Sequence, residues 1–137
     1  MAEPEINLEP GMHHELQWTV TPELSAPHLG SGTLRVFATP AMVALIENAC
    51  SSLVQPFLPE GHTTVGVLVH VQHLAATPVG DSVVARVELQ AVEGNLLTFN
   101  AEVSDSSEVV GRGHHQRAII EIERFLARVA GKSAPGA

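Results

Sequence analysis

The dipeptide Thr39-Pro40 restricts the fold more than any other feature of this sequence. Threonine is favoured as the N-cap of a helix and proline at the first helical position, while a residue before proline avoids the helical region. We therefore predict a helix that begins at Pro40, with Thr39 as its N-cap. The apolar residues that follow recur at helical spacing and cover most of the circumference: Met42, Val43, Leu45, Ile46, Ala49, Cys50 and Leu53. Such a helix is expected to be buried on most sides.

Outside this helix the apolar residues mostly alternate with a period of two, which indicates strands. The predicted strands are residues 15–20 before the helix and residues 63–72, 82–92, 96–103 and 108–122 after it. In the first strand after the helix, the pattern separates two sets of side chains onto opposite sides: Val65, Val67, Val69 and Val71 against Leu68, His70 and Gln72.

Turn sequences connect the last three strands. Glu93-Gly94-Asn95 and Asp105-Ser106-Ser107 are typical of hairpin connections, and residues 124–129 suggest a terminal helical turn. One buried helix among antiparallel strands predicts an α+β fold in which the sheet wraps around a central helix. The 137 residues suffice for one such domain, which we place at residues 12–129, between flexible tails at 1–11 and 130–137.

The composition argues against several classes of partner. Fifteen acidic and seven basic residues give a net charge of -8, which repels nucleic acid on average. The longest apolar runs are of strand length, far below the ~20 residues that cross a bilayer. The single cysteine, Cys50, has no partner for an intramolecular disulfide. We therefore expect a cytoplasmic protein without a nucleic-acid or membrane partner.

Two candidate functional residues belong to the predicted helix. A hydroxyl at a helix start, as at Thr39, lies beside free backbone N–H groups that can hold an oxyanion, although the residue can also be a plain N-cap. Glu47 lies at the edge of the buried face, where a carboxylate is costly to ionise unless it is paired. The alternative for Glu47 is a border residue that faces water.

His73 ends a valine-rich strand and precedes a loop, a position where functional groups are often displayed. Its ordinary pKa suits proton transfer near neutrality, and the alternative is a polar edge residue. The neighbouring His70 is an odd number of residues away, so on a regular strand the two rings face opposite sides. His114 and His115 are adjacent, so their rings also face opposite sides of a regular strand and cannot bind one metal together. We therefore predict no metal site.

Arg117 is a further candidate on the last predicted strand. It lies six residues after Gly111 and on the same face, where it could meet a carboxylate or a phosphate. The alternative is a surface arginine. Glycines within a strand, as at Gly111 and Gly113, indicate a bulge or the close approach of a ligand or helix.

Three segments together resemble the fluoroacetyl-CoA thioesterase family of hotdog-fold thioesterases. Residues 36–43 (VFATPAMV) and 47–50 (ENAC) are similar to its central helix, residues 71–78 (VQHLAATP) to its histidine strand, and residues 111–117 (GRGHHQR) to its last strand. The resemblance spans roughly residues 15–129. The family's threonine, glutamate and histidine keep their mutual spacing here as Thr39, Glu47 and His73.

The resemblance implies a hotdog fold and a homodimer, or a dimer of dimers, with CoA bound across the subunit interface. It also implies that Thr39 and Glu47 attack the thioester or activate water, and that His73 assists proton transfer. Gly66 and Arg117 match positions near the acyl site or its support. No cofactor is expected beyond the CoA thioester that serves as substrate.

One departure from the family bears on the substrate. The selective family enzyme has a longer lid before the central helix, with phenylalanine in it, whereas residues 24–35 contain none. A general short-chain acyl-CoA is therefore the expected substrate class. Two alternatives stay open: a hotdog hydratase or dehydratase, whose usual Asp-x4-His pair does not occur here, and a non-catalytic acyl-CoA-binding module.

Overall fold

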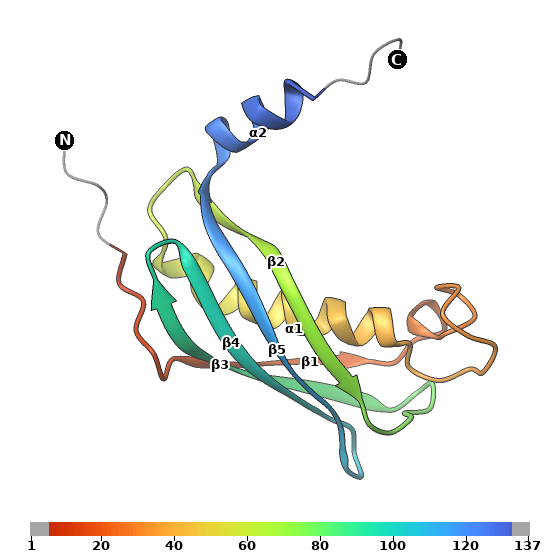
Figure 1. Ribbon diagram of the computed structural model, residues 1–137. Coiled ribbons are helices and arrows are strands. Elements are labelled where there is room, and N and C mark those ends of the chain that lie inside the picture. The colour runs from red at the N-terminus through yellow and green to blue at the C-terminus, as the bar shows by residue number, and fades with distance from the viewer. Residues whose placement is uncertain (1–5, 133–137) are drawn as a thin grey trace.

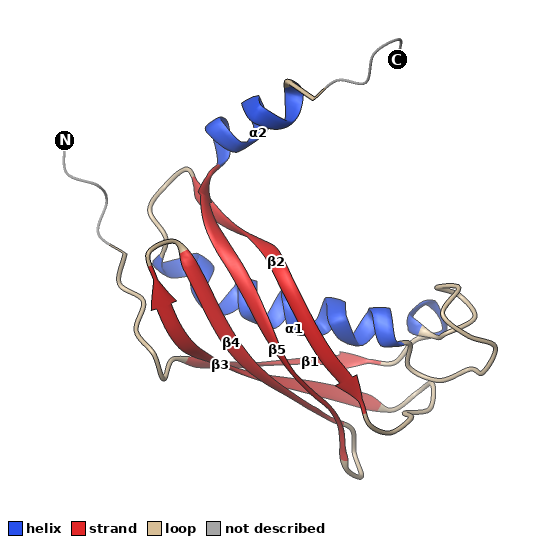
Figure 2. Cartoon of the chain, in the orientation of Figure 1, coloured by secondary structure: helices blue, strands red, loops and turns tan. Residues whose placement is uncertain are grey.

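The computed structural model of the protein describes residues 6–132, which form one antiparallel sheet with a helix against its inner face (Figures 1 and 2). The strands are β1 (His13–Thr19), β2 (His62–His73), β3 (Ser82–Glu93), β4 (Leu96–Ser104) and β5 (Val109–Glu121). The helices are α1 (Thr39–Val54) and α2 (Ile122–Ala130), with short 3-10 turns at Pro22–Leu24 and Gln55–Phe57. The strand order is β1-β3-β4-β5-β2. The predicted α+β architecture is confirmed.

The apolar face of α1 forms the centre of the core, as its spacing predicts. Its buried residues are Ala41, Met42, Leu45, Ile46, Ala49, Cys50, Leu53 and Val54. The predicted helix start is wrong by one residue. Ala38 is extended (φ -78°, ψ 145°) and its carbonyl accepts the first helical bond from the N–H of Met42 at 3.0 Å. Thr39 is therefore the first helical residue and not the N-cap. A proline disfavours the helical conformation in the residue before it but does not forbid it.

Strand β2 lies at the open edge of the sheet and contains a β-bulge. Gly66 pairs with Arg117 and Leu68 with Gln116, so Val67 is an extra residue without a partner in the ladder. A bulge reverses the alternation of side chains beyond it. The prediction that Val65, Val67, Val69 and Val71 share one side is therefore wrong. Thr64 and Gly66 face α1 before the bulge, and His73 faces it after the bulge.

Both predicted hairpins are present. Gly94, with a positive φ of 62°, turns β3 into β4, a conformation that favours glycine. Between β4 and β5 the carboxylate of Asp105 accepts bonds from the N–H groups of Ser107 and Glu108 at 2.8 and 3.0 Å. The predicted terminal turn is a full helix, α2, which stands clear of the sheet beyond β5 (Figure 1).

The expected tails fall partly outside the described residues. Leu8, inside the segment 1–11, is buried and packs into the core, and the N–H of Gly11 donates to the carbonyl of Leu89 at 2.8 Å. The packed part of the chain therefore begins before residue 12. Residues 6–132 contain no helix long and apolar enough to cross a membrane.

Candidate active site

Helix α1 runs along β2 in the opposite direction, so each candidate on the helix meets one part of that strand. The start of α1 meets the end of β2, where Thr39 lies against His73. Its middle meets the bulge, where Glu47 lies beside Gly66. The two points are about eight helical residues apart, or about 12 Å of rise. The candidates therefore form two clusters.

The first cluster is a hydrogen-bonded pair. Oγ1 of Thr39 and Nδ1 of His73 are 2.8 Å apart. The ring of Phe37, which is buried, packs edge-on against the imidazole of His73, with 6.3 Å between ring centroids. Nε2 of His73 is buried and has no hydrogen-bond partner among the described residues. A hydroxyl bonded to an imidazole nitrogen is the arrangement from which a histidine can accept the hydroxyl proton.

Burial lowers the pKa of His73 below its usual value, because it disfavours the charged ring. A hydrogen bond with the backbone of Ala75 raises the pKa and offsets part of this effect. The imidazole is therefore neutral at physiological pH and can accept a proton.

A missing side chain on β5 allows the helix to approach this closely. Gly111 pairs with His73 in the sheet, and a Cβ at Gly111 would lie only 2.4 Å from Sδ of Met42. A side chain at position 111 would have to displace the thioether end of Met42, which is fully buried. Gly111 thus makes room for Met42 of α1, and of the two readings of this glycine the close approach of a helix is confirmed.

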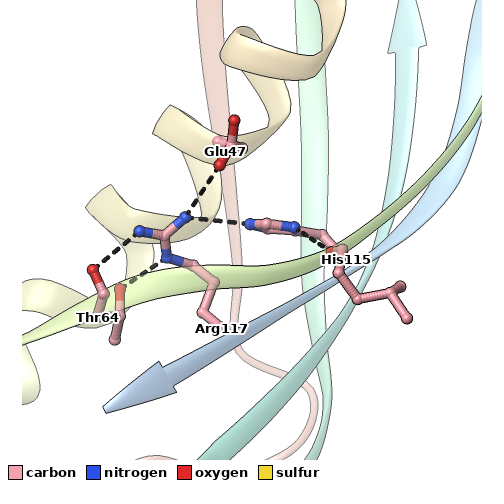
Figure 3. Close-up of polar contacts among 5 residues, drawn as sticks. Glu47, Thr64, His115 and Arg117 are labelled. Atoms are coloured by element: carbon pink, nitrogen blue, oxygen red, sulfur yellow. Dashed lines mark hydrogen bonds and ion pairs between the residues drawn. The ribbon is translucent and has the colours of Figure 1, made fainter. Parts of the chain in front are cut away.

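The second cluster is centred on the buried guanidinium of Arg117 (Figure 3). Its Nε donates to Oγ1 of Thr64 at 2.7 Å, and its Nη2 donates to the carbonyl of Thr64 at 3.0 Å. Nη1 lies 3.1 Å from Nε2 of His115 and 3.7 Å from Oε2 of Glu47. The Arg117 side chain is 9% exposed and that of Glu47 40%. The cluster therefore holds a cation in the interior and leaves the carboxylate at the surface.

The hydrogen bonds of His115 define its tautomer. Arg117 can only donate, so Nε2 of His115 accepts and Nδ1 carries the proton that it donates to the carbonyl of Leu68 at 2.8 Å. Burial is the main cause that lowers the pKa of His115, and the charge of Arg117 adds to it. A neutral His115 therefore supports Arg117 without competing for Glu47.

Gly66 leaves room for the carboxylate of Glu47. A Cβ at Gly66 would lie 2.8 Å from Oε2 of Glu47 and 3.4 Å from the His115 ring. Any side chain there would displace the carboxylate. Gly66 and Glu47 thus belong to one site, although the sequence relates them only through the family resemblance.

Each candidate now has a definite place. Thr39 pairs with His73, and Glu47, Gly66 and Arg117 form the other cluster. Arg117 is not a surface arginine, and Thr39 is not a plain N-cap. Sequence reasoning missed two supporting residues, Thr64 and His115; the shared parity of His115 and Arg117 on one strand was the available signal.

A surface pocket of about 510 Å³ opens beside the first cluster. It is lined by Ala26, Ser31, Gly32, Thr33, Leu34, Val36, Phe37, Ala38, Thr39, His73, Leu74, Ala75 and Ala76. Thr39 is exposed and His73 half-buried, so both can reach a molecule in the pocket. Mostly small and apolar lining residues suit an aliphatic group.

Cys50 is not a candidate nucleophile. It is buried in the core, and burial raises the pKa of its thiol to about 12. The thiolate that would react is therefore absent at neutral pH.

Comparisons with known proteins show the family and the fold of this chain. The family profile described as fluoroacetyl-CoA-specific thioesterase matches residues 20–123. The fluoroacetyl-CoA thioesterase of Streptantibioticus cattleyicolor is 41% identical over 101 residues, 74% of this chain and 73% of that protein. A solved structure of fluoroacetyl-CoA thioesterase superposes with a TM-score of 0.89 at 34% identity, covering 93% of this chain and 99% of that one. A Thermus thermophilus thioesterase superfamily member gives 0.84 at 26% identity, covering 90% and 91%. The predicted hotdog fold is confirmed.

Proposed function

This chain belongs to the fluoroacetyl-CoA-specific thioesterase family and is an acyl-CoA thioesterase, and on that premise we propose that Thr39, His73 and Glu47 carry out the hydrolysis. The observation that supports this assignment most directly is the 2.8 Å hydrogen bond between Thr39 and His73 beside an open pocket. A nucleophile and a base at this distance form the usual unit of covalent acyl transfer.

The reaction proceeds in two steps in this proposal. Oγ1 of Thr39 attacks the thioester carbonyl while His73 accepts its proton, the C–S bond breaks, and the proton passes to the leaving thiolate of CoA. Because about 12 Å of helical rise separates Glu47 from Thr39, Glu47 then takes a proton through an intervening water from the water that attacks the acyl-threonine. The same proton returns to the leaving Oγ1 of Thr39 as the acid is released, which restores the hydroxyl. Arg117 and Gly66 keep the carboxylate of Glu47 in place.

The substrate class is a short-chain acyl-CoA. A solved variant of the family enzyme is a complex with fluoroacetate and CoA, so the family pocket admits a two-carbon acid. Here the pocket wall formed by Ser31, Gly32, Thr33 and Leu34 contains no aromatic ring, and the phenylalanine of the pocket, Phe37, packs against His73 instead. Without an aromatic side chain in that wall, we expect little discrimination between fluoroacetyl and acetyl.

Thiol release from a series of acyl-CoAs, from acetyl to medium chain and including fluoroacetyl, tests this proposal. We expect the highest kcat/KM for short chains and similar values for acetyl and fluoroacetyl. Thr39→Ser keeps a hydroxyl and should stay active, whereas Thr39→Val should lose about 10²-fold or more in kcat. Equal rates for the two variants would exclude Thr39 as the nucleophile.

We further propose that the protein is a homodimer joined through β2. This strand is an unpaired edge that exposes Val67, Leu68 and Val69, and such an edge is usually covered or paired. Light scattering should give the mass of a dimer or of a dimer of dimers, and a stable monomer would contradict the proposal. The cytoplasmic location and the lack of nucleic-acid and membrane partners stay predictions.

A further inference from the structure

We propose that α2 of each subunit reaches the active site of the other and binds the phosphate groups of CoA there. The proposal rests on the thioesterase function and on the β2 dimer given above. It assigns a ligand-binding role to the basic side chains Arg124, Arg128 and Lys132, and a docking role to the apolar side of the same helix.

The positive charges of the chain are concentrated on α2. Arg117 is buried beside Glu47, and on the outer face of the sheet Arg86 pairs with Glu15 at 2.8 Å and Arg112 with Glu102 at 3.4 Å. The remaining basic residues are Arg35, Arg124, Arg128 and Lys132. Of these, Arg124 lies 3.7 Å from Oε2 of Glu121, in a pair whose arginine side chain is 85% exposed and which is therefore weak. Three of these four lie on α2 or just after it, in a chain of net charge -8. Phosphates need such cations, and α2 is where the chain concentrates them.

Helix α2 is divided into two sides. Ile122, Phe125, Leu126 and Val129 are all exposed and fall on one face. Arg124 and Arg128 are spaced by four residues and therefore lie along the side of α2 away from that face, at about 100° per residue. Lys132 follows just beyond the end of the helix, and we call these three residues the basic stripe. A helix with an apolar face without a partner and a basic stripe away from it is suited to dock on one surface while it holds an anion at the edge.

The position of α2 places it far from its own Thr39–His73 pair and favours that of the partner. His62 pairs with Glu121, so α2 begins at the His62 end of β2. Its own His73 is at the other end of this 12-residue strand, about 36 Å away, and the nine residues of α2 span only about 13 Å. Two β2 strands paired antiparallel about a two-fold axis place the His62 end of each beside the His73 end of the other.

The surface that α2 would meet on the second copy is apolar. Leu34 and Leu74 are exposed and line the pocket beside Thr39 and His73. The second copy occupies this apolar face of α2, because one two-fold axis brings together the open β2 edge, the exposed leucines and that face. The basic stripe then lies at the pocket mouth, where the CoA tail emerges.

A substrate without phosphates isolates this role. We would replace Arg124, Arg128 and Lys132 together by glutamine, which preserves helix propensity, and compare acetyl-CoA with acetyl-N-acetylcysteamine. The ratio of kcat/KM for the first to that for the second should fall about tenfold, and added salt should lower the wild-type ratio similarly. Arg86→Gln with Arg112→Gln is the matched control, because these cations lie on the outer face.

Mixed dimers test whether the helix acts on the other subunit. A subunit that carries His73→Ala leaves one working site per dimer. With the glutamine changes on that same inactive subunit, the working site should show the lowered ratio. With the changes on the active subunit instead, the ratio should stay at the wild-type value.

The outcomes are distinct. A wild-type ratio in the triple variant, or an effect that follows the active subunit in mixed dimers, overturns the proposal. If the triple variant keeps its ratio and loses binding to vesicles of anionic phospholipid, α2 is a membrane-surface helix and the proposal is also overturned. Failure of wild-type protein to hydrolyse either thioester would instead refute the proposed function.

Discussion

The two clusters along α1 and β2 differ in how firmly they are held. Thr39 and His73 share one hydrogen bond at an exposed helix start, and Nε2 of His73 has no partner among the described residues. Glu47 faces a guanidinium that makes two bonds to Thr64 and one to His115. In the proposed mechanism the proton of Thr39 passes to the group with spare hydrogen-bonding capacity, whereas the carboxylate that takes the proton of water is oriented by a network prepared in advance.

This difference has a common structural origin in the bulge at Val67. Before the bulge, Thr64 and Gly66 face the helix, and after it His73 does so. On a regular strand, residues 66 and 73 would face opposite sides. One extra residue thus allows a single strand to serve both clusters.

The largest effect is expected for Glu47→Gln, which keeps the size of the side chain and removes its charge. Turnover should fall by about 10³-fold or more, with an unchanged fold, because the amide cannot accept a proton from water. Acyl-CoA hydrolysis and circular dichroism on one preparation measure both quantities. Glu60→Gln, at an exposed loop position, is the control, and unchanged activity in Glu47→Gln would remove the carboxylate from the mechanism.

His73→Ala should lower kcat by roughly 10² to 10⁴-fold. The pKa of His73 is lowered by burial, so wild-type activity should persist below pH 6.5 and decline only as the ring is protonated. His70→Ala, on the other side of the strand, is the matched control. If the folded His73→Ala variant turned over normally with the same pH profile, His73 would be structural only.

The same lowered pKa predicts how stability depends on pH. The folded protein binds fewer protons at His73 and His115 than the unfolded chain, so stability is full above the unfolded pKa of about 6.5 and declines as pH falls below it. His73→Ala should weaken this decline in urea unfolding, leaving the part due to His115. A decline of the same size in that variant would show that His73 does not contribute to the pH dependence of stability.

Arg117→Met tests the firmly held cluster and should affect stability as much as activity. Removal of the guanidinium leaves Nε2 of His115 and the carbonyl of Thr64 without their donors, at a cost of about 1–3 kcal/mol. Activity should fall about tenfold as Glu47 loses its orientation. Arg112→Met, at the surface, should change unfolding by less than about 0.5 kcal/mol, and equal effects would mean that the network is not structural.

The smallest effect is expected for Gly66→Ala. The new Cβ would lie 2.8 Å from Oε2 of Glu47, so the carboxylate would have to move. Because it ends a flexible side chain, this movement costs little stability. Activity should fall about threefold to tenfold, since small misplacements of reacting groups are costly. In a Glu47→Gln background the same change should have no further effect, and an additive loss would show that Gly66 acts elsewhere.

Much of this protein is readable from local sequence. The apolar spacing of α1, the alternation in β3 and the Gly94 turn each act within a few residues, where steric and hydrophobic preferences operate directly. The sequence by itself thus determined one buried helix, five strands and two hairpins. Joint spacing of Thr39, Glu47 and His73 also indicated the family, although no single one of them did.

Tertiary structure decided the rest, because the relevant contacts join residues far apart in the chain. A bulge is one residue in a run of valines, and only pairing with β5 shows that Val67 is the extra one. The tautomer of His115 and the burial of Arg117 depend on Thr64 and Leu68, about fifty positions away. Hydrogen bonds in the interior depend on which distant groups the fold brings into contact, and the local sequence around each group does not reveal its partner.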